Sequence, residues 1–257
     1  MPKSKKNCRH IGVLSAMPEE VGIILSNLES INSDEFGDLK LYSGKFDLNN
    51  SKEIFITTAW SGWGKVSAAR ATTRLLSSRY NAIPIDTVMF TGVAGAVDTE
   101  LKKWDIILAD SIVQHDMDAR PLFDKYVIPA LQNKKITPNI DFLNKTFNGL
   151  NTELKKNCFS KFGSLRKGLI ATGDMFISSR KKINQLSREI PGLCAVEMEG
   201  AAFAQVAFQE KVNWLVLRTI SDNANETASS DFNEFLCEYK LKSFDLIKSA
   251  INAMALN

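Results

Sequence analysis

The segment HIGVLSAMPEEVGIILSNL (10–28) passes from a short apolar run directly into an amphipathic pattern. The run at 10–17 ends in small residues, and the apolar residues from Val21 to Leu28 then recur at helical spacing. We therefore expect a strand that leads into a helix. Such a unit is typical of α/β folds, in which strands alternate with helices around a central sheet.

The same alternation continues along the chain. Four further apolar runs, each reaching a glycine or an aspartate near its end, predict buried strands at 86–92, 105–110, 168–174 and 213–222. Two runs rich in β-branched and aromatic residues, LKLYSGKF and EIFITTAW, flank DLNNSK and predict a hairpin. Ligands in such folds bind beyond the carboxyl ends of the strands, so chemistry is expected there.

Three segments between or after these strands have helical periodicity, at 64–80, 199–210 and 231–254. In the first, the face expected to point inward carries Val66, Ala69, Thr73, Leu76 and Tyr80. In the last, that face carries Phe235, Tyr239, Leu246 and Ala250. The sequence thus predicts an α/β fold: a single-domain, three-layer α/β/α sandwich with a mixed central β-sheet at 11–257, after a basic, flexible leader at 1–10.

Composition excludes several classes of protein. The chain has 257 residues, is 44% hydrophobic and carries a formal charge of only +3, with its basic residues scattered among acids. A nucleic-acid partner is therefore disfavoured, and no apolar run is long enough to span a membrane. The four cysteines form no CxxC pair, so reduced thiols are expected instead of zinc ligands or disulfides. The default location is the cytoplasm.

Three short motifs have both a functional and a structural interpretation. GWGKVS (62–67) matches neither a dinucleotide fingerprint nor a P-loop. A tight turn into a helix explains Gly62, whereas Trp63 and Gly64 have a functional interpretation as a backbone wall near a small ligand. TGVAGA (91–96) brings backbone close to a ligand or simply ends a strand. QHDMD (114–118) suggests a metal site, but the chain has only two histidines, so a hydrogen-bonded turn is favoured.

Carboxylates follow several of the predicted strands. Glu20 comes after the first strand and Asp222 ends the last, while AVEMEGAA (195–202) places Glu197 and Glu199 in an apolar run. Each has an ordinary interpretation as a cap or as a paired buried charge. Together, Glu20, Glu199 and Asp222 predict one pocket. Separated carboxylates suit displacement at an acetal-like carbon, where one acid protonates the leaving group and one carboxylate activates water.

The motifs IGVLSAMPEEV, SGWGKVSAA, TGVAGA, GLIATGDMFI, AVEMEGAA and LRTISDNANE…DFNEFL occur in this order over nearly the entire chain. They resemble those of the 5'-methylthioadenosine/S-adenosylhomocysteine nucleosidases, within the purine nucleoside phosphorylase superfamily. The resemblance implies a nucleoside phosphorylase-like fold. It also implies hydrolysis of the N-glycosidic bond of 5'-methylthioadenosine, S-adenosylhomocysteine or 5'-deoxyadenosine, with release of adenine, in methionine salvage.

By this resemblance, Asp222, supported by Ser221, protonates purine N7, and Glu20 orients or deprotonates the attacking water. Glu199 accepts hydrogen bonds from ribose hydroxyls, with Arg218 helping to hold Glu199 and the water, whereas Glu197 has a structural role. The other implied binding residues are Met17 and Met198 near the sugar, Phe176 and Ile177 at the adenine, Val93 near the water, and Trp63 near the 5' end.

The resemblance further implies a homodimer whose pocket is completed by an apolar residue of the neighbouring subunit, for which Phe123 is the candidate. No metal or organic cofactor is expected. An acidic SAMPEEV loop repels phosphate, so hydrolysis by water is favoured over phosphorolysis. The alternatives are a 6-amino-6-deoxyfutalosine or futalosine hydrolase, a purine nucleoside phosphorylase, and a non-catalytic nucleoside-binding or storage protein on the same fold.

Overall fold

The computed structural model describes residues 9–48, 53–156, 159, 161–225 and 227–256. The expected leader therefore lies largely outside the described residues. Its last two residues, Arg9 and His10, belong instead to the first strand, where the buried His10 ring bonds Thr57 Oγ1 at 2.7 Å and the Ile83 carbonyl oxygen at 2.8 Å. These buried contacts explain why the strand begins before the apolar run.

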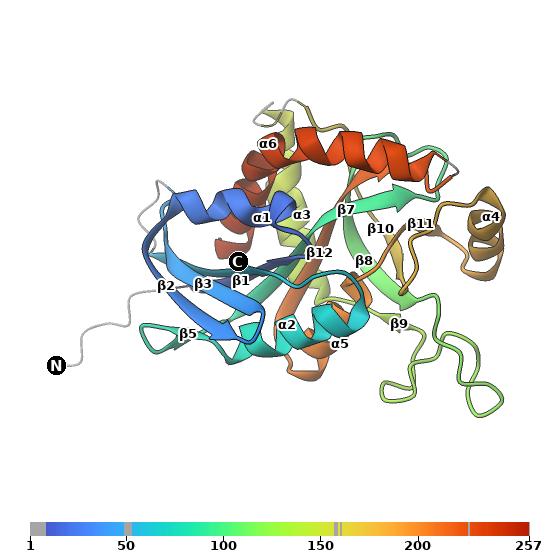
Figure 1. The fold of residues 1–257 in the computed structure, drawn as a ribbon, viewed down its shortest axis with the longest axis horizontal. Helices are drawn as coiled ribbons and strands as arrows, with labels where there is room; N and C mark the ends of the chain where they lie inside the picture. The colour runs from blue at the N-terminus through green and yellow to red at the C-terminus, as the bar shows by residue number, and fades with distance from the viewer. Residues whose placement is uncertain (1–8, 49–52, 157–158, 160, 226, 257) are drawn as a thin grey trace.

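A ten-stranded mixed sheet forms the centre of the molecule (Figure 1). Nine strands follow the order β11-β10-β8-β12-β7-β1-β4-β3-β2, and β9 pairs with β8. Their bounds are β1 Arg9–Ser15, β2 Leu28–Phe36, β3 Leu39–Phe46, β4 Ile54–Trp60, β7 Thr87–Ala96, β8 Ile106–Gln114, β9 Lys135–Ile136, β10 Leu165–Thr172, β11 Leu193–Glu197 and β12 Asn213–Asp222. A separate small hairpin pairs β5 (Arg79–Tyr80) with β6 (Ile83–Pro84).

Helices cover both faces of the sheet and create the predicted three layers (Figure 1). On one face lie α2 (Lys65–Ser77) and α5 (Gly200–Gln209), which pack against each other. On the other face, α6 (Ala228–Ala255) packs against α1 (Pro18–Val21) and α3 (Ile140–Lys155). The short α4 (Arg180–Glu189) lies at the end of the sheet near β11. Each layer has its own apolar core against the sheet.

The sheet closes on itself at one end. β11 is parallel to β10 and also pairs antiparallel with β7, through Ala195 opposite Ala96 and Val196 opposite Gly95. The strands β7, β12, β8, β10 and β11 therefore form a closed ring. This closure brings the end of β11 next to the ends of β7 and β12, although long stretches of sequence separate them.

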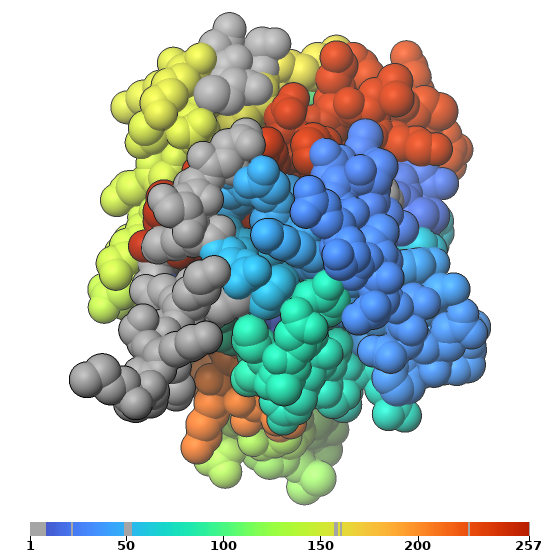
Figure 2. Space-filling model, turned by 90° about the vertical axis from the view of Figure 1, so that its left-hand side faces the viewer, coloured from blue at the N-terminus to red at the C-terminus, as the bar shows by residue number. Residues whose placement is uncertain are grey.

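The predicted strands and hairpin are confirmed, but the expected helix after the first strand is much shorter. α1 has four residues, a 3-10 helix follows at Gly22–Asn27, and Leu28 already begins β2, where it pairs with Phe46. β2 was not predicted because most of its side chains are exposed and its sequence is polar. Figure 2 shows this edge of the molecule, where the blue atoms of the segment around β2 lie at the surface.

The predicted inward face of α2 is only partly correct, since Ala69 and Leu76 are partly buried against the core. The buried residues are Ala68, Ala71, Thr72 and Leu75, whereas Val66 is 80% exposed. Both faces of this helix carry small apolar residues, so periodicity alone did not distinguish them. The small side chains of the buried face let α2 pack closely, and Leu75 lies against Gly12 of β1, where an added Cβ would overlap its side chain.

The predicted inward face of the terminal helix is confirmed, since Phe235, Tyr239, Leu246 and Ala250 are all buried. Within the described part of the chain, no helix is both long and apolar enough to cross a membrane. Cys194 and Cys237 are free thiols. Cys8 and Cys158 lie outside the described residues.

Candidate active site

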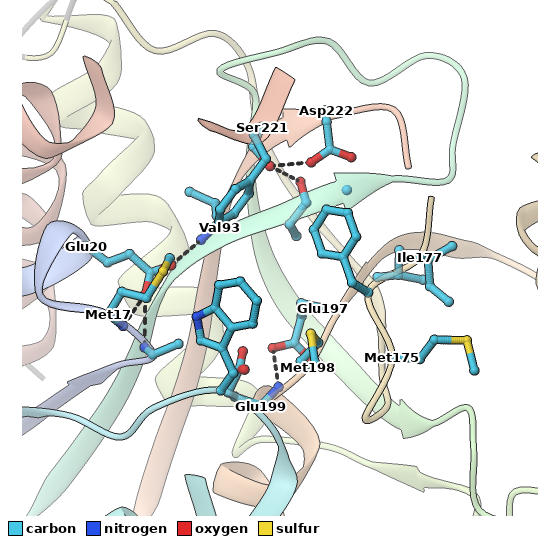
Figure 3. Close-up of a pocket in the computed structure, with 17 residues that line it drawn as sticks. Met17, Glu20, Val93, Met175, Ile177, Glu197, Met198, Glu199, Ser221 and Asp222 are labelled. Carbon is cyan, nitrogen blue, oxygen red and sulfur yellow. Dashed lines mark hydrogen bonds between the residues drawn. The ribbon is translucent and has the colours of Figure 1, made fainter. Parts of the chain in front are cut away.

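The three carboxylates that the sequence places at strand ends share one pocket (Figure 3). Glu20 comes from α1, Glu199 from the turn between β11 and α5, and Asp222 from the end of β12. The hollow holds about 560 Å³ of space between protein atoms, its mouth included. It is lined by Ala16, Met17, Glu20, Trp63, Val93, Ala94, Gly95, Met175, Phe176, Ile177, Val196, Glu197, Met198, Glu199, Ser221, Asp222 and Phe232.

Glu20 is held by backbone amides on one side of the pocket. Its Oε2 accepts hydrogen bonds from the amides of Ala16 and Met17, both at 2.9 Å, and its Oε1 accepts one from Val93 at 3.1 Å. Burial raises the pKa of this carboxyl, and the Arg218 charge and the three amides oppose that rise. Glu20 and Arg218 approach β7 at Gly92, where an added Cβ would overlap both side chains. The three amide hydrogen bonds therefore fix the Glu20 carboxyl at the pocket wall.

The carboxyl of Asp222, with Ser221 beside it, lies across the pocket from Glu20 (Figure 3). The Ser221 hydroxyl donates to Asp222 Oδ2 at 2.6 Å, and the Ala224 amide donates to Asp222 Oδ1 at 2.7 Å. Burial raises the pKa of Asp222, and both hydrogen bonds oppose the rise. The predicted support of Asp222 by Ser221 is therefore present as a direct hydrogen bond. A carboxyl with a raised pKa suits a general acid.

Glu197 and Glu199 are only two positions apart in the sequence, but their side chains have different partners. Glu197 ends β11 and accepts hydrogen bonds from the Thr172 hydroxyl and the Arg218 guanidinium. It also accepts hydrogen bonds from the amides of Glu199 at 3.1 Å and Gly200 at 2.7 Å, and so satisfies the first amide of α5, which has no partner within the helix. Its charge is thus satisfied within the protein, which agrees with the structural role expected for it.

Glu199 has fewer protein partners. The Gly64 amide donates to its Oε1 at 2.8 Å, and Arg218 Nη2 lies 3.6 Å from its Oε2. Burial, reinforced by the Glu197 charge, raises the pKa of Glu199 to about 8. A buried carboxyl with free acceptor capacity at a pocket wall is arranged to receive hydroxyl donors from a ligand.

Aromatic and sulfur-containing side chains supply the apolar part of the pocket. The Phe232 ring meets Phe176 edge-on with centroids 5.9 Å apart, and it meets Trp63 edge-on at 6.2 Å. Six lining residues were not among the predicted site residues: Ala16, Ala94, Gly95, Met175, Val196 and Phe232. Phe232 lies at the start of a helix remote in sequence from the other lining residues, and only its place in the DFNEFL motif marked it.

Most predicted binding residues line this pocket: Met17, Trp63, Val93, Phe176, Ile177, Met198 and Ser221 join the carboxylates there. Arg218 lies behind the wall, 1% exposed, with its guanidinium 4.7 Å from the Phe90 ring centroid. Phe123 does not line the pocket. It is 37% exposed in the segment between β8 and β9, which projects from the body of the molecule in Figure 1.

The side chains of the QHDMD motif are engaged by other protein groups. Asp116 pairs with Lys65 and Asp118 with Arg120, while the buried His115 ring packs against Gly173. Among the residues with described positions, no cluster of three or more histidines, cysteines or carboxylates could hold a metal ion. The motif is therefore a set of loop contacts in this structure.

The fold and the pocket at its strand ends define a member of the phosphorylase superfamily, whose family model matches residues 10–252. The chain is 33% identical over 244 residues to a 5'-methylthioadenosine/S-adenosylhomocysteine nucleosidase of Staphylococcus epidermidis, covering 95% of this chain and all of the relative. Within the superfamily, the chain therefore belongs to the 5'-methylthioadenosine/S-adenosylhomocysteine nucleosidase family.

Solved structures of similar proteins support the same family and fold. The Colwellia psychrerythraea nucleosidase in complex with adenine is 30% identical, with a TM-score of 0.82 and 96% of each chain covered. A futalosine hydrolase of Helicobacter pylori is 31% identical, with a TM-score of 0.80 and coverage of 95% of this chain and 97% of that one. The predicted family and fold class are thus confirmed.

Proposed function

We propose that this protein is an N-glycosyl hydrolase that releases adenine from 5'-methylthioadenosine, S-adenosylhomocysteine or 5'-deoxyadenosine. The observation that carries the proposal is the convergence of Glu20, Glu199 and Asp222 on one apolar-walled pocket. Membership of the nucleosidase family supports the same reaction. Two further carboxyls, Glu20 and Asp222, whose pKa values are raised by burial, lie beside the proposed sugar-binding carboxyl and favour an enzyme over a nucleoside-binding or storage protein.

Asp222 is the proposed general acid. Its proton passes to N7 of the purine as the glycosidic bond breaks, so that adenine leaves as a neutral base. The raised pKa keeps the proton available, and the Ser221 and Ala224 bonds fix the carboxyl and stabilise its anion after transfer. Phe176 and Ile177 hold the base, with Phe176 stacking on the ring.

Glu20 is the proposed base for the attacking water. Its three amide partners fix the carboxylate, and its position across the pocket from Asp222 suits attack on an oxocarbenium-like sugar. Among the described lining residues there is no lysine or arginine to neutralise a phosphate nucleophile. A phosphate would also meet the charge of Glu20, so water is the favoured nucleophile over phosphate.

Glu199 is the proposed sugar clamp, with Met198 against the ribose and Met17, Val93 and Trp63 around the 5' end and the water. Because protein donors reach Glu199 from the Gly64 and Arg218 sides only, ribose hydroxyls complete its hydrogen bonds. Arg218 holds Glu197 directly and lies within ion-pair distance of Glu199.

The proposal includes a homodimer in which Phe123 of one subunit closes the pocket of the other. It is supported by the exposure of Phe123 and Leu122, which is 84% exposed, on a projecting segment. It also includes a role in methionine salvage and a cytoplasmic location. The sulfur-containing substrate class supports the proposed role in methionine salvage.

The test is adenine release from 5'-methylthioadenosine by the purified protein, with and without phosphate, with identification of the sugar. Phosphate-independent release of methylthioribose is the expected result. A sugar 1-phosphate would instead identify a phosphorylase and remove Glu20 from its role. Faster cleavage of futalosine or 6-amino-6-deoxyfutalosine would favour the alternative that the Helicobacter pylori structure represents. Binding without cleavage of any of these nucleosides would leave the non-catalytic alternative.

A further inference from the structure

Three segments adjoining the pocket are joined by one polar cluster outside it. Lys65 begins α2, Asp116 follows β8, and Asp174 follows β10. Lys65 Nζ pairs with Asp116 Oδ1 at 2.6 Å, Asp116 Oδ2 accepts the Asp174 amide at 2.9 Å, and Asp174 Oδ1 accepts the Lys65 amide at 2.7 Å. We call these three residues the loop clasp.

Asp116 is the centre of the loop clasp, because its two oxygens bind two different segments. An exposed ion pair alone contributes little to stability. The Asp116 side chain, however, is only 29% exposed, and its second oxygen is committed to a backbone amide. Burial tends to raise the pKa of Asp116, but Lys65 and the Asp174 amide outweigh burial and lower it. Asp116 therefore stays ionised while it bridges the segments.

The loop clasp adjoins the residues that form the pocket. Gly64, next to Lys65, donates its amide to Glu199, and Trp63 precedes it on the pocket wall. On the other side, Met175 and Phe176 directly follow Asp174 and also line the pocket. Gly64 has a φ of +90°, and an added Cβ would lie 2.9 Å from Asp174 Oδ1. Only glycine brings the two loops this close while pointing its amide at Glu199.

We propose that Asp116 is a positioning residue for nucleoside binding, acting through the loop clasp. It holds the Trp63 loop against the Asp174 loop, and it thereby keeps the Gly64 amide on Glu199 Oε1 and leaves the rest of the carboxylate to the substrate. This inference rests on the proposed function, because it assigns to Asp116 the alignment of the proposed sugar clamp. It gives the QHDMD motif a function that needs no metal.

The test compares Asp116→Ala and Asp116→Asn with the matched control Asp98→Asn. The Asp98 side chain is also 29% exposed and pairs with Arg166 at 2.8 Å, but this pair does not join the Lys65 and Asp174 segments. For 5'-methylthioadenosine, both Asp116 variants should raise KM about tenfold, as expected for loss of charge-assisted hydrogen bonds, with a much smaller change in kcat. Asp98→Asn should leave both constants unchanged.

Two further readouts separate positioning from a general loss of stability. The wild-type preference for 5'-methylthioadenosine over its 3'-deoxy analogue should shrink in the Asp116 variants, because a misaligned Glu199 gains less from the hydroxyl. Amide hydrogen exchange without substrate should rise in both 61–66 and 173–178, and not in α6. The Asn variant, which keeps the size of the side chain, serves where the Ala variant does not fold.

An unchanged KM and unchanged exchange in both loops would overturn the proposal. So would a uniform rise in exchange over the whole chain, or an undiminished preference for the 3'-hydroxyl. If the wild type cleaves none of 5'-methylthioadenosine, S-adenosylhomocysteine and 5'-deoxyadenosine, the proposed function fails instead, and the exchange in the two loops alone then decides whether Asp116 fixes them.

Discussion

Arg218 and Glu197 form a buried ion pair at the wall of the pocket, with side chains that are 1% and 2% exposed. Glu199 lies beside this pair, 3.6 Å from Arg218 Nη2. The two glutamates of one short motif therefore differ in their partners: Glu197 neutralises Arg218, whereas Glu199 keeps acceptor capacity that faces the pocket. This difference explains how two carboxylates occupy an apolar segment without two unpaired charges.

Replacing Glu197 tests its structural role. Glu197→Gln should lower the free energy of unfolding by about 3 kcal/mol, because the buried Arg218 loses its main counter-charge. Urea denaturation measures the loss. Glu35→Gln, which removes the exposed pair with Lys40, should leave the free energy of unfolding almost unchanged. Equal effects of the two substitutions would contradict the assignment of Glu197.

Replacing Asp222 tests the proposed general acid. Asp222→Asn should lower kcat about 100-fold or more while KM changes little, because the proton is needed mainly in the transition state. In the wild type, kcat/KM should fall as pH rises through the raised pKa of Asp222 and the acid is lost. Ser221→Ala should move this fall to higher pH, because the Ser221 hydrogen bond lowers that pKa. Full activity of Asp222→Asn would remove Asp222 from the mechanism.

Replacing Glu20 tests the proposed base. Glu20→Gln should lower kcat with little change in KM. Steady-state kinetics measure both constants, with Glu19→Gln as the control because Glu19 does not line the pocket. Because burial raises the pKa of Glu20, wild-type activity should fall as pH drops through that pKa and the base is protonated. Weaker binding with normal turnover would show that Glu20 does not activate water.

Glu199 links stability to pH. Its pKa is about 8 in the folded protein, against an ordinary value of 4.5, so the folded state binds more protons than the unfolded state between these values. Its contribution to stability is therefore complete below about pH 4.5 and is lost as pH rises to 8. Glu199→Gln should be more stable than the wild type at pH 8, by a few kcal/mol, and similar to it at pH 4.5. If denaturation curves showed the same stability difference between the variant and the wild type at every pH, the raised pKa of Glu199 would be contradicted.

Phe123 tests the proposed dimer. Phe123→Ala should raise KM, because the pocket of the neighbouring subunit loses an apolar wall. Unfolding and refolding a mixture of Phe123→Ala and Asp222→Asn should restore low-KM activity, since one site of each mixed dimer then has both an intact Asp222 and a neighbouring Phe123. The shared pocket would be contradicted if the wild type sedimented as a fully active monomer. It would also be contradicted if the refolded mixture were no more active than the two variants refolded separately.

The elements that the sequence predicts correctly are those that depend on residues close together in the chain. Strands such as 213–222 were identified because their apolar runs and terminal polar residues are local features. β2 was missed because an exposed edge strand needs only a partner, here β3, and no apolar pattern of its own. The α2 face was partly misassigned because the choice between two small-residue faces is made by the packing of α5 and the sheet.

The order of motifs along the chain was enough to indicate the family, the alternating architecture and the three carboxylates, because each depends on residue type and local spacing. The contacts that give those carboxylates their separate properties required the folded sheet. The pairing of β11 with β7 places Glu197 by Arg218, and α6 brings Phe232 to Trp63 and Phe176. These contacts join segments that are far apart in the chain. Each carboxyl therefore becomes buried and gains its charged partner only when the ring of strands closes.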